Sequence, residues 1–295
     1  MIRAVLLGAC ALLAPVHAAA QAPAAGGGAE LRVGVEARRD RLFYHFDNPS
    51  SIDTAFLVPH FFEQRYVADN VWLMVSARYT AGVRWETSGG LTPERASTAD
   101  DYDTFLDPGG PVIVSGTTGG AAIRSLRFSQ LAEIARLGPG NPSGRVRLFA
   151  GYRFREDRST FQTGHKTVTR DGTLVEAFDV TTRETTSAQE HAILGGAAAT
   201  WILGGPWRLS ASGEIAPVVL ARLLVQLPDK YPGQDLVFIA KVAAGSARVA
   251  LTRTLREWQI DVLTDAGTTW SYARTARLEH RALGAQLSIG RSWQP

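Results

Sequence analysis

The sequence is nearly without cysteine and methionine. Its 295 residues include one cysteine, Cys10, and two methionines. A single cysteine excludes an internal disulfide framework and a cysteine-rich zinc site. No later segment approaches the ~18 uncharged apolar residues that a membrane-spanning helix needs. The chain also has no phosphate-cradling glycine loop and no Gly-x-Ser-x-Gly motif, so the commonest nucleotide-binding and hydrolase signatures are absent.

The N-terminus has the pattern of a secretory signal peptide. Arg3 precedes an apolar run from Ala4 to Val16, and the small residues Ala18-Ala19-Ala20 follow it. We expect cleavage near Ala20, which makes residues 1–20 the signal peptide and 21–30 a flexible lead-in. Cys10 then lies inside the apolar core of the signal. The alternative is a lipoprotein cleavage box, because Leu7-Gly8-Ala9 precedes this cysteine.

The clearest structural pattern is a strand with a tryptophan at each end. Between Trp258 and Trp270 the even positions are mostly apolar, and the odd positions carry Asp261 and Asp265. Successive side chains of a strand point to opposite faces. A strand of this length, tilted by ~45°, spans roughly 28 Å, close to the ~25 Å apolar band of an outer-membrane barrel. Indole rings favour the two interfaces of a bilayer, so this segment is typical of a transmembrane strand.

Ten segments show comparable alternation. They cover about 31–45, 54–66, 71–86, 121–137, 145–155, 186–203, 207–217, 235–252, 258–270 and 280–293. A short turn is expected at 67–70, and long polar stretches at 88–120 and 157–185. The Thr-rich second stretch is expected to extend its strands as a hairpin. Short turns at one rim and long loops at the other are typical of bacterial outer-membrane barrels. We therefore predict a closed antiparallel transmembrane β-barrel of about ten strands, a single domain over residues 31–295.

Several local features follow from this assignment. The apolar parity of the first strand shifts after Ala37, which predicts a bulge there. Lys241 and Arg248 have opposite parities, which predicts another bulge in the eighth segment. With both termini on the periplasmic side, one group of tryptophans marks the periplasmic rim, namely Trp201, Trp207, Trp258 and Trp293. Trp85 and Trp270 are expected at the outer rim.

Periodicity alone does not distinguish inside from outside, so a soluble, lipocalin-like barrel is the alternative. Up to ten strands, strands of 13 or more residues and tryptophans at both ends of one face favour the membrane barrel. The polar faces then point into the lumen, where mixed charges pair with each other and fill it. The alternative for the arginines is an anion site. The expected lumen residues are Arg78, Arg84, Glu86, Arg127, Glu133, Arg145, Arg147, Arg153, Arg155, Glu214, Glu257, Asp261 and Asp265.

An acidic segment falls in the first long polar stretch. Asp100-Asp101-Tyr102-Asp103 places three carboxylates within four residues. Neighbouring carboxylates repel, so one of them can hold a proton and act as a general base, or the group can bind a metal or position a water. A solvated loop or a weak calcium site is the simpler interpretation.

The chain resembles the omptin family of outer-membrane endopeptidases in three features. These are the ten predicted strands, the acidic segment after the third strand, and the sequence Gly-Tyr-Arg-Phe-Arg at Gly151 to Arg155. The resemblance implies an aspartate pair in the second outer loop and an Asp–His dyad in the fourth. These four side chains activate a water for attack on a peptide carbonyl. On this chain the acidic pair corresponds to Asp101 and Asp103.

The dyad of the family has no matching residues. Anchored on Pro232-Gly233, the family histidine falls at Asp229 and the family aspartate at Leu227. No histidine occurs between His191 and His280. A substitute base would have to come from His165 or His280. Ligand contacts around this cleft are expected from Asp100, Tyr102, His165, His280, Arg84 and Arg155.

Three functions remain open: a barrel that binds a surface ligand or peptide without cleaving it, a divergent omptin-like endopeptidase, and a narrow channel or structural barrel. No cofactor is expected, and lipopolysaccharide is a candidate activator or structural lipid. Its phosphates would contact basic residues expected near the outer rim, namely Arg84, Arg155, Arg158 and Lys166. The formal net charge of +3 gives no argument for nucleic acid. We expect a monomer in the outer membrane of a Gram-negative bacterium, with its loops facing the exterior.

Overall fold

The computed structural model describes residues 28–48, 60–106, 110–138, 144–228, 233, 235–271 and 276–293. In these residues no helix is long and apolar enough to cross a membrane. The expected signal peptide and Asp229 lie outside the described residues. The described elements are β1 (Ala29–Asn48), β2 (His60–Ala81), β3 (Val83–Leu106), β4 (Val112–Leu137), β5 (Arg145–Arg170), β6 (Thr173–Thr181), β7 (Thr185–Gly204), β8 (Trp207–Gln226), β9 (Asp235–Leu255), β10 (Trp258–Ser271) and β11 (Ala276–Trp293).

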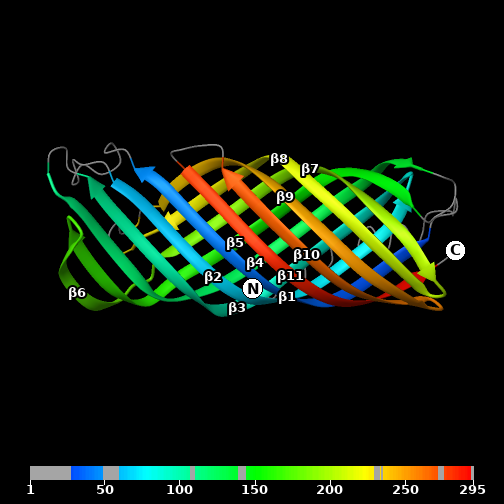
Figure 1. Ribbon diagram of the computed structural model, residues 1–295, viewed down its shortest axis with the longest axis horizontal. Coiled ribbons are helices and arrows are strands. Elements are labelled where there is room, and N and C mark those ends of the chain that lie inside the picture. The colour runs from blue at the N-terminus through cyan, green and yellow to red at the C-terminus, as the bar shows by residue number, and fades with distance from the viewer. Residues whose placement is uncertain are drawn as a thin grey trace.

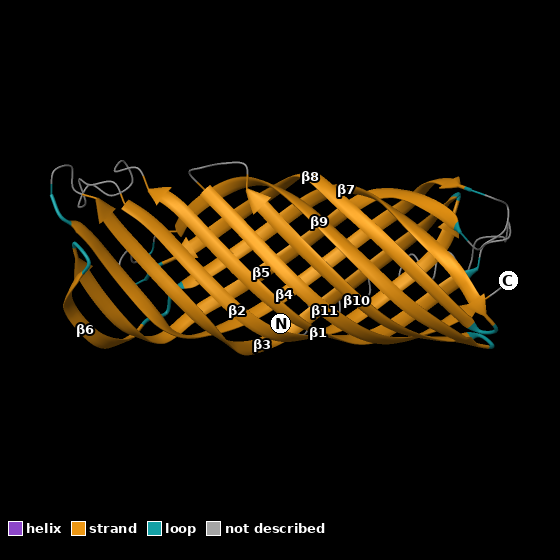
Figure 2. Ribbon diagram, viewed as in Figure 1, coloured by secondary structure: helices purple, strands orange, loops and turns teal. Residues whose placement is uncertain are grey.

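Ten of these strands form a closed antiparallel ring (Figures 1 and 2). Consecutive strands pair from β1 to β5, β5 pairs with β7, and β7 to β11 pair in turn. The ring closes where β11 pairs with β1. The remaining strand, β6, pairs among the described strands only with β5 and forms a hairpin at one end of the barrel. The predicted barrel of about ten strands and the predicted Thr-rich hairpin are both confirmed.

The two ends of the barrel differ. The end that carries Gly28 and Trp293 is called the terminal rim, and the opposite end the loop rim. At the terminal rim the strand connections are short, and β2 and β3 are joined by Gly82 alone. Gly82 adopts a φ of 70°, a left-handed conformation that a residue without a Cβ adopts at little cost. The β5–β6 hairpin projects at the loop rim (Figure 1).

The second and third predicted strands are wrong as separate elements. The described part of the second, residues 60–66, and most of the third, residues 71–81, belong to β2, and the predicted turn at 67–70 lies inside it. That segment looked like a turn because its polar Asn70 points into the lumen, where it is buried. It also coincides with an irregularity, since the β2–β3 register shifts between Val67 and Leu73. The true turn is at Gly82, inside the segment predicted as strand three.

The predicted polar stretch at 88–120 is also wrong. It contains most of β3 and the first part of β4. These segments are rich in Thr, Ser, Gly and Asp, so they lack the apolar alternation that marks a membrane-facing strand. Their backbone groups are satisfied by ladder pairing, which continues from Asp100↔Thr118 to Leu106↔Val112. The barrel wall is therefore taller on this side than the sequence pattern indicated.

The two predicted bulges are wrong as well. β1 keeps an unbroken register with both neighbours, and Leu42 has the same inward parity as Glu36. What changes along β1 is the chemistry of the lumen rather than the backbone. In the eighth predicted strand, now β9, Lys241 faces outward and Arg248 inward. The irregularity lies instead in β8. There the pairing register with β9 shifts between Ala216 and Val219, a segment that contains Pro217.

Large apolar side chains cover the outside of the ring. Ile193, Ile215 and Ile239 are 76%, 66% and 69% exposed. This outward surface, which we call the apolar band, fits the hydrocarbon region of a bilayer and not the inward-facing apolar surface of a lipocalin-like barrel. Exposed tryptophans lie at its terminal edge as predicted, namely Trp201, Trp207, Trp258 and Trp293. Trp85 does not mark the opposite edge, because β3 begins at Val83 on the terminal rim.

Candidate functional site in the lumen

The lumen is organised in layers, and β1 shows why. Its inward side chains are charged at Glu36, Arg38 and Asp40, then apolar at Leu42 and Tyr44. All five are buried. Side chains of one parity share a face, so this sequence places a charged layer midway along the lumen and an apolar layer nearer the loop rim.

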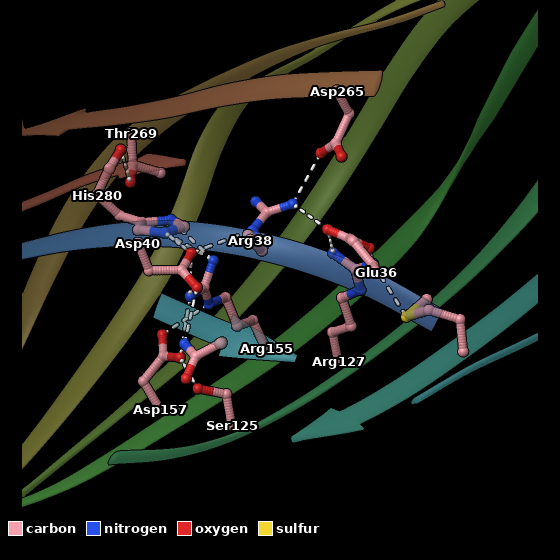
Figure 3. Close-up of polar contacts among 12 residues, drawn as sticks. Glu36, Arg38, Asp40, Ser125, Arg127, Arg155, Asp157, Asp265, Thr269 and His280 are labelled. Carbon is pink, nitrogen blue, oxygen red and sulfur yellow. Dashed lines mark hydrogen bonds and ion pairs between the residues drawn. The ribbon is translucent and has the colours of Figure 1, made fainter. Parts of the chain in front are cut away.

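Asp40 lies at the centre of the charged layer (Figure 3). One oxygen, Oδ1, accepts from Arg38 at 3.1 Å, from Arg155 at 3.3 Å and from Nε2 of His280 at 2.8 Å. The other oxygen accepts from the Asn70 amide at 3.0 Å. Four donors from four different strands therefore surround one buried carboxylate, which satisfies both of its oxygens.

Arg155 connects Asp40 to the opposite wall. Its guanidinium donates to Asp157 at 2.6 and 3.0 Å, and Asp157 also accepts from the Ser125 hydroxyl at 2.6 Å. The same guanidinium lies 2.9 Å from both Nδ1 and Nε2 of His280, so Arg155 and His280 contact each other as well as Asp40.

The charged layer continues toward the terminal rim. Arg38 donates to Glu36 at 3.0 Å and to Asp265 at 2.7 Å, and Arg127 pairs with Glu36. The Arg127 guanidinium also lies over the buried Trp72 ring, 4.7 Å from its centroid. These contacts cross from β1 to β4 and β10, so together with Arg155 they span the lumen (Figure 3). The predicted self-neutralising network is present in this layer.

The apolar layer fills the lumen nearer the loop rim. The ring of Phe46 stacks on Phe62 at 5.8 Å and, across the lumen, on Phe238 at 4.2 Å between centroids. Tyr44 and Tyr66 are almost fully buried beside them. With these rings packed across it, the described lumen is closed toward the loop rim.

Asp101 and Asp103 are not in a loop. Both lie on β3 with buried, inward-facing side chains. Through the strand register Asp101 aligns with Gln64 on β2, which aligns with Tyr44 on β1. Tyr44 lies four residues from Asp40, about 13 Å along the strand at ~3.3 Å per residue. The acidic pair is thus level with the apolar layer, and it is separated along the barrel from the Asp40–His280 contact.

The other predicted site residues do not form one cleft. Asp100 and Tyr102 have the opposite parity on β3, and the Tyr102 ring packs under the Arg65 guanidinium at 5.8 Å. His165 lies in the β5–β6 hairpin, 2.9 Å from Asp179.

The predicted basic residues of the outer rim lie elsewhere too. Arg84 lies at the terminal rim, and Arg155 is buried, so neither faces the outer rim as predicted. Glu257, predicted in the lumen, is in the exposed β9–β10 turn and pairs with Arg291 at 2.8 Å.

Sequence reasoning missed the central role of β1. Asp40, Arg38 and Glu36 share one parity, which is a readable signal. The signal was hidden because the following Leu42 and Tyr44 suggested a change of face. His280 was predicted as a ligand residue or substitute base of an outer cleft, and the structure places it in the buried charged layer, where it contacts Asp40 and Arg155.

The fold is similar to solved structures of bacterial outer-membrane barrels. The outer membrane protease OmpT from Escherichia coli matches with a TM-score of 0.63 and 10% identity, covering 92% of this chain and 99% of that one. The beta domain of the Bordetella autotransporter BrkA gives a TM-score of 0.37 at 14% identity, covering 91% and 100%. Ail of Yersinia pestis gives 0.22 at 10%, covering 89% and 99%. No protein-family model matches the sequence. No curated protein matches it either. The chain has the fold of an outer-membrane β-barrel, and its similarity to OmpT is one of architecture.

Proposed function

We propose that this chain is an outer-membrane barrel whose loop rim faces the cell exterior, and that it binds an extended basic polypeptide there without cleaving it. The observation that supports peptide binding is the free edge of β6. This strand pairs with β5 on one side and with no described strand on the other. A free edge presents a row of backbone donors and acceptors, which an added strand can pair with.

The chemistry of β6 indicates what it binds. Its nine residues include Glu176 and Asp179 and no lysine or arginine. The segment of β5 that already pairs with it is Thr-rich and basic, with Lys166 and Arg170. Leu174 and Phe178 are 59% and 44% exposed on the hairpin. A basic segment with Thr and apolar residues therefore complements this edge. Two acidic β6 edges repel each other, which favours a monomer.

The closed lumen argues against proteolysis and transport. His280 is buried and contacts Asp40, but the packed apolar layer separates this pair from the loop rim. A peptide arriving from outside has no described path to the imidazole. The acidic pair is about 13 Å away along the strand, too far for one water to contact both groups. The same packing blocks a continuous channel through the described lumen.

We propose that lipopolysaccharide contacts a cluster of arginines on the outer surface of β1 and β11, and not the residues predicted from the sequence. On the outside, Arg41 lies directly opposite Arg281 on the next strand, and Arg39 and Arg277 lie near them on the same face. Arg281 lies 3.9 Å from Glu279 and Arg39 lies 3.7 Å from Asp69, so these carboxylates offset part of the positive charge. The repulsion that remains between like charges in direct register is relieved by an anion. These side chains follow the apolar band toward the loop rim, where phosphates of lipopolysaccharide would lie in the proposed orientation. Arg84 and Arg155 have no part in this contact.

Peptide binding is tested with a labelled copy of residues 163–170, Thr-Gly-His-Lys-Thr-Val-Thr-Arg. Fluorescence anisotropy on the barrel refolded with lipopolysaccharide should show saturable binding. Leu174→Lys with Phe178→Lys should weaken it at least tenfold, because lysines on an edge repel a basic strand. Val112→Lys, exposed near the loop rim but off this edge, is the matched control and should bind normally.

A second probe separates strand addition from simple charge attraction. The same peptide methylated on alternate backbone nitrogens keeps its charges but loses half of its donors. It should fail to bind. Equal binding of the two peptides would contradict strand addition, and a shift of the barrel itself to a dimer would assign the edge to a second copy of the chain.

Proteolysis is the second candidate, favoured by the 2.8 Å contact between Asp40 and His280. Dibasic peptides incubated with the refolded barrel and lipopolysaccharide should remain intact by mass spectrometry. Cleavage that disappears in Asp101→Ala, Asp103→Ala and His280→Ala would establish the endopeptidase and overturn the non-cleaving proposal.

A further inference from the structure

A cavity of about 300 Å³ lies between the charged layer and the terminal rim. Its walls come from both sides of the barrel, including β3, β5, β8 and β9. The lining side chains include eight arginines and four glutamates and neither lysine nor aspartate. This leaves an excess of four positive charges in the lining, whereas the three arginines of the charged layer above it are matched by four carboxylates.

The four glutamates are already engaged. Glu30 pairs with Arg32 and lies 3.8 Å from Arg78, and Glu86 accepts from Arg78 at 2.8 Å. The other two pair as Glu133 with Arg136 and Glu214 with Arg153. The carboxylates therefore neutralise only part of the wall.

Three arginines remain without a carboxylate. Within the described part of the chain Arg84, Arg208 and Arg248 form no salt bridge. Arg84 lies on β3, whereas Arg208 and Arg248 lie on β8 and β9, so they approach the cavity from different walls. Arg208 and Arg248 are exposed and Arg84 is partly exposed, which leaves their guanidinium groups accessible from the cavity.

We propose that this cavity binds a compact phosphate-bearing anion of the diphosphate type. Guanidinium groups bind phosphate oxygens through paired N–H donors. A diphosphate concentrates several negative charges in one small group, which suits an excess of four positive charges better than a single carboxylate does. The cavity is large enough for such a group with a small organic substituent. The charged layer closes its inner end, so it is a binding site and not part of a channel.

The test uses inorganic pyrophosphate and the intact barrel refolded in zwitterionic detergent. Isothermal titration calorimetry at low salt should show saturable binding with one site per chain, weakening as salt is raised. Replacement of all three arginines, Arg84→Gln with Arg208→Gln and Arg248→Gln, should weaken the affinity at least tenfold. The matched control replaces three outward arginines, Arg39→Gln with Arg277→Gln and Arg281→Gln, and should retain it.

Two further measurements assign the source and exclude misfolding. Circular dichroism melting should show the three-glutamine cavity variant folded, because it removes repulsion and no ion pair. Competition by anionic phospholipid in mixed micelles would identify a lipid headgroup as the occupant, and no competition a soluble phosphate; both support the site. Absence of saturable binding to the unmodified barrel, or equal loss in the two triple variants, would overturn the proposal.

Discussion

Nε2 of His280 on β11 lies 2.8 Å from Oδ1 of Asp40 on β1. A buried Asp–His contact invites a catalytic interpretation, but its surroundings indicate a structural one. Asp40 also accepts from Arg38, Arg155 and Asn70. A carboxylate that accepts hydrogen bonds on both oxygens and is buried with its partners stabilises a network.

Loss of Asp40 should therefore be costly. We expect Asp40→Ala to lower the free energy of unfolding by about 3–5 kcal/mol, because Arg38 and Arg155 stay buried without their shared acceptor. Urea unfolding of the refolded barrel measures this. Asp69→Ala is the control: its side chain is 75% exposed and lies 3.7 Å from Arg39, so its effect should stay within about 0.5 kcal/mol. Equal effects would mean that the charged layer adds little.

The apolar layer makes a separate prediction. Phe46→Ala should lower the free energy of unfolding by about 3–5 kcal/mol, since the ring is fully buried. A double-mutant cycle with Phe238→Ala should give a coupling energy of about 0.5–1.5 kcal/mol for the stacked rings. Phe178→Ala on the exposed hairpin should be nearly neutral. A coupling indistinguishable from zero would show that the two rings do not pack across the lumen in the membrane.

Adjacent glycines on β4 provide a matched test of the tall wall. A Cβ on Gly119 would lie 2.0 Å from the Thr163 carbonyl oxygen, whereas on Gly120 its nearest contact would be 3.9 Å. Gly119→Ala should destabilise the barrel by about 1–3 kcal/mol, because two backbones must separate. Gly120→Ala should be neutral or slightly stabilising. If both variants unfold at the same urea concentration, β4 and β5 are not paired in this register.

Orientation is testable with single cysteines on a Cys10→Ser background. Glu176→Cys lies in the loop-rim hairpin and Pro206→Cys in a terminal-rim turn. A membrane-impermeant maleimide applied to intact cells should label position 176 and leave position 206 unmodified until the membrane is permeabilised. The reverse pattern would place the loop rim in the periplasm.

The sequence predicted some strands much better than others, for a physical reason. From Thr185 onward the strands lie mainly within the apolar band, so outward residues such as Ile193 and Val262 alternate with small or polar inward ones. β3 and the first part of β4 extend beyond that band toward the loop rim. There the strands are stabilised by hydrogen bonding to neighbouring strands and not by contact with lipid. Ladder pairing leaves little periodic signal in one chain, so Asp101 and Asp103 looked like loop residues.

The candidate site was harder to predict than the fold. Arg155 and His280 were among the residues singled out from the sequence, but their partner Asp40 was not, because the contact between Asp40 and His280 joins residues from opposite ends of the sequence. Parity shows which side chains enter the lumen, but not which of them meet across it. That information depends on barrel diameter and strand stagger.

The ring closes along a seam between its first and last strands, paired from Ala29↔Trp293 to Phe46↔Ala276. Asp40 and His280 belong to those two strands, so their contact bridges the seam as well as filling the interior. Contacts between the ends of a chain form late, because they require the largest loop to close. The pairing of β1 with β11 and the burial of the His280 imidazole should therefore occur together during assembly. A chain arrested before that event would leave the carboxylate and the ring open to solvent, a chemical difference between unfinished and finished barrels.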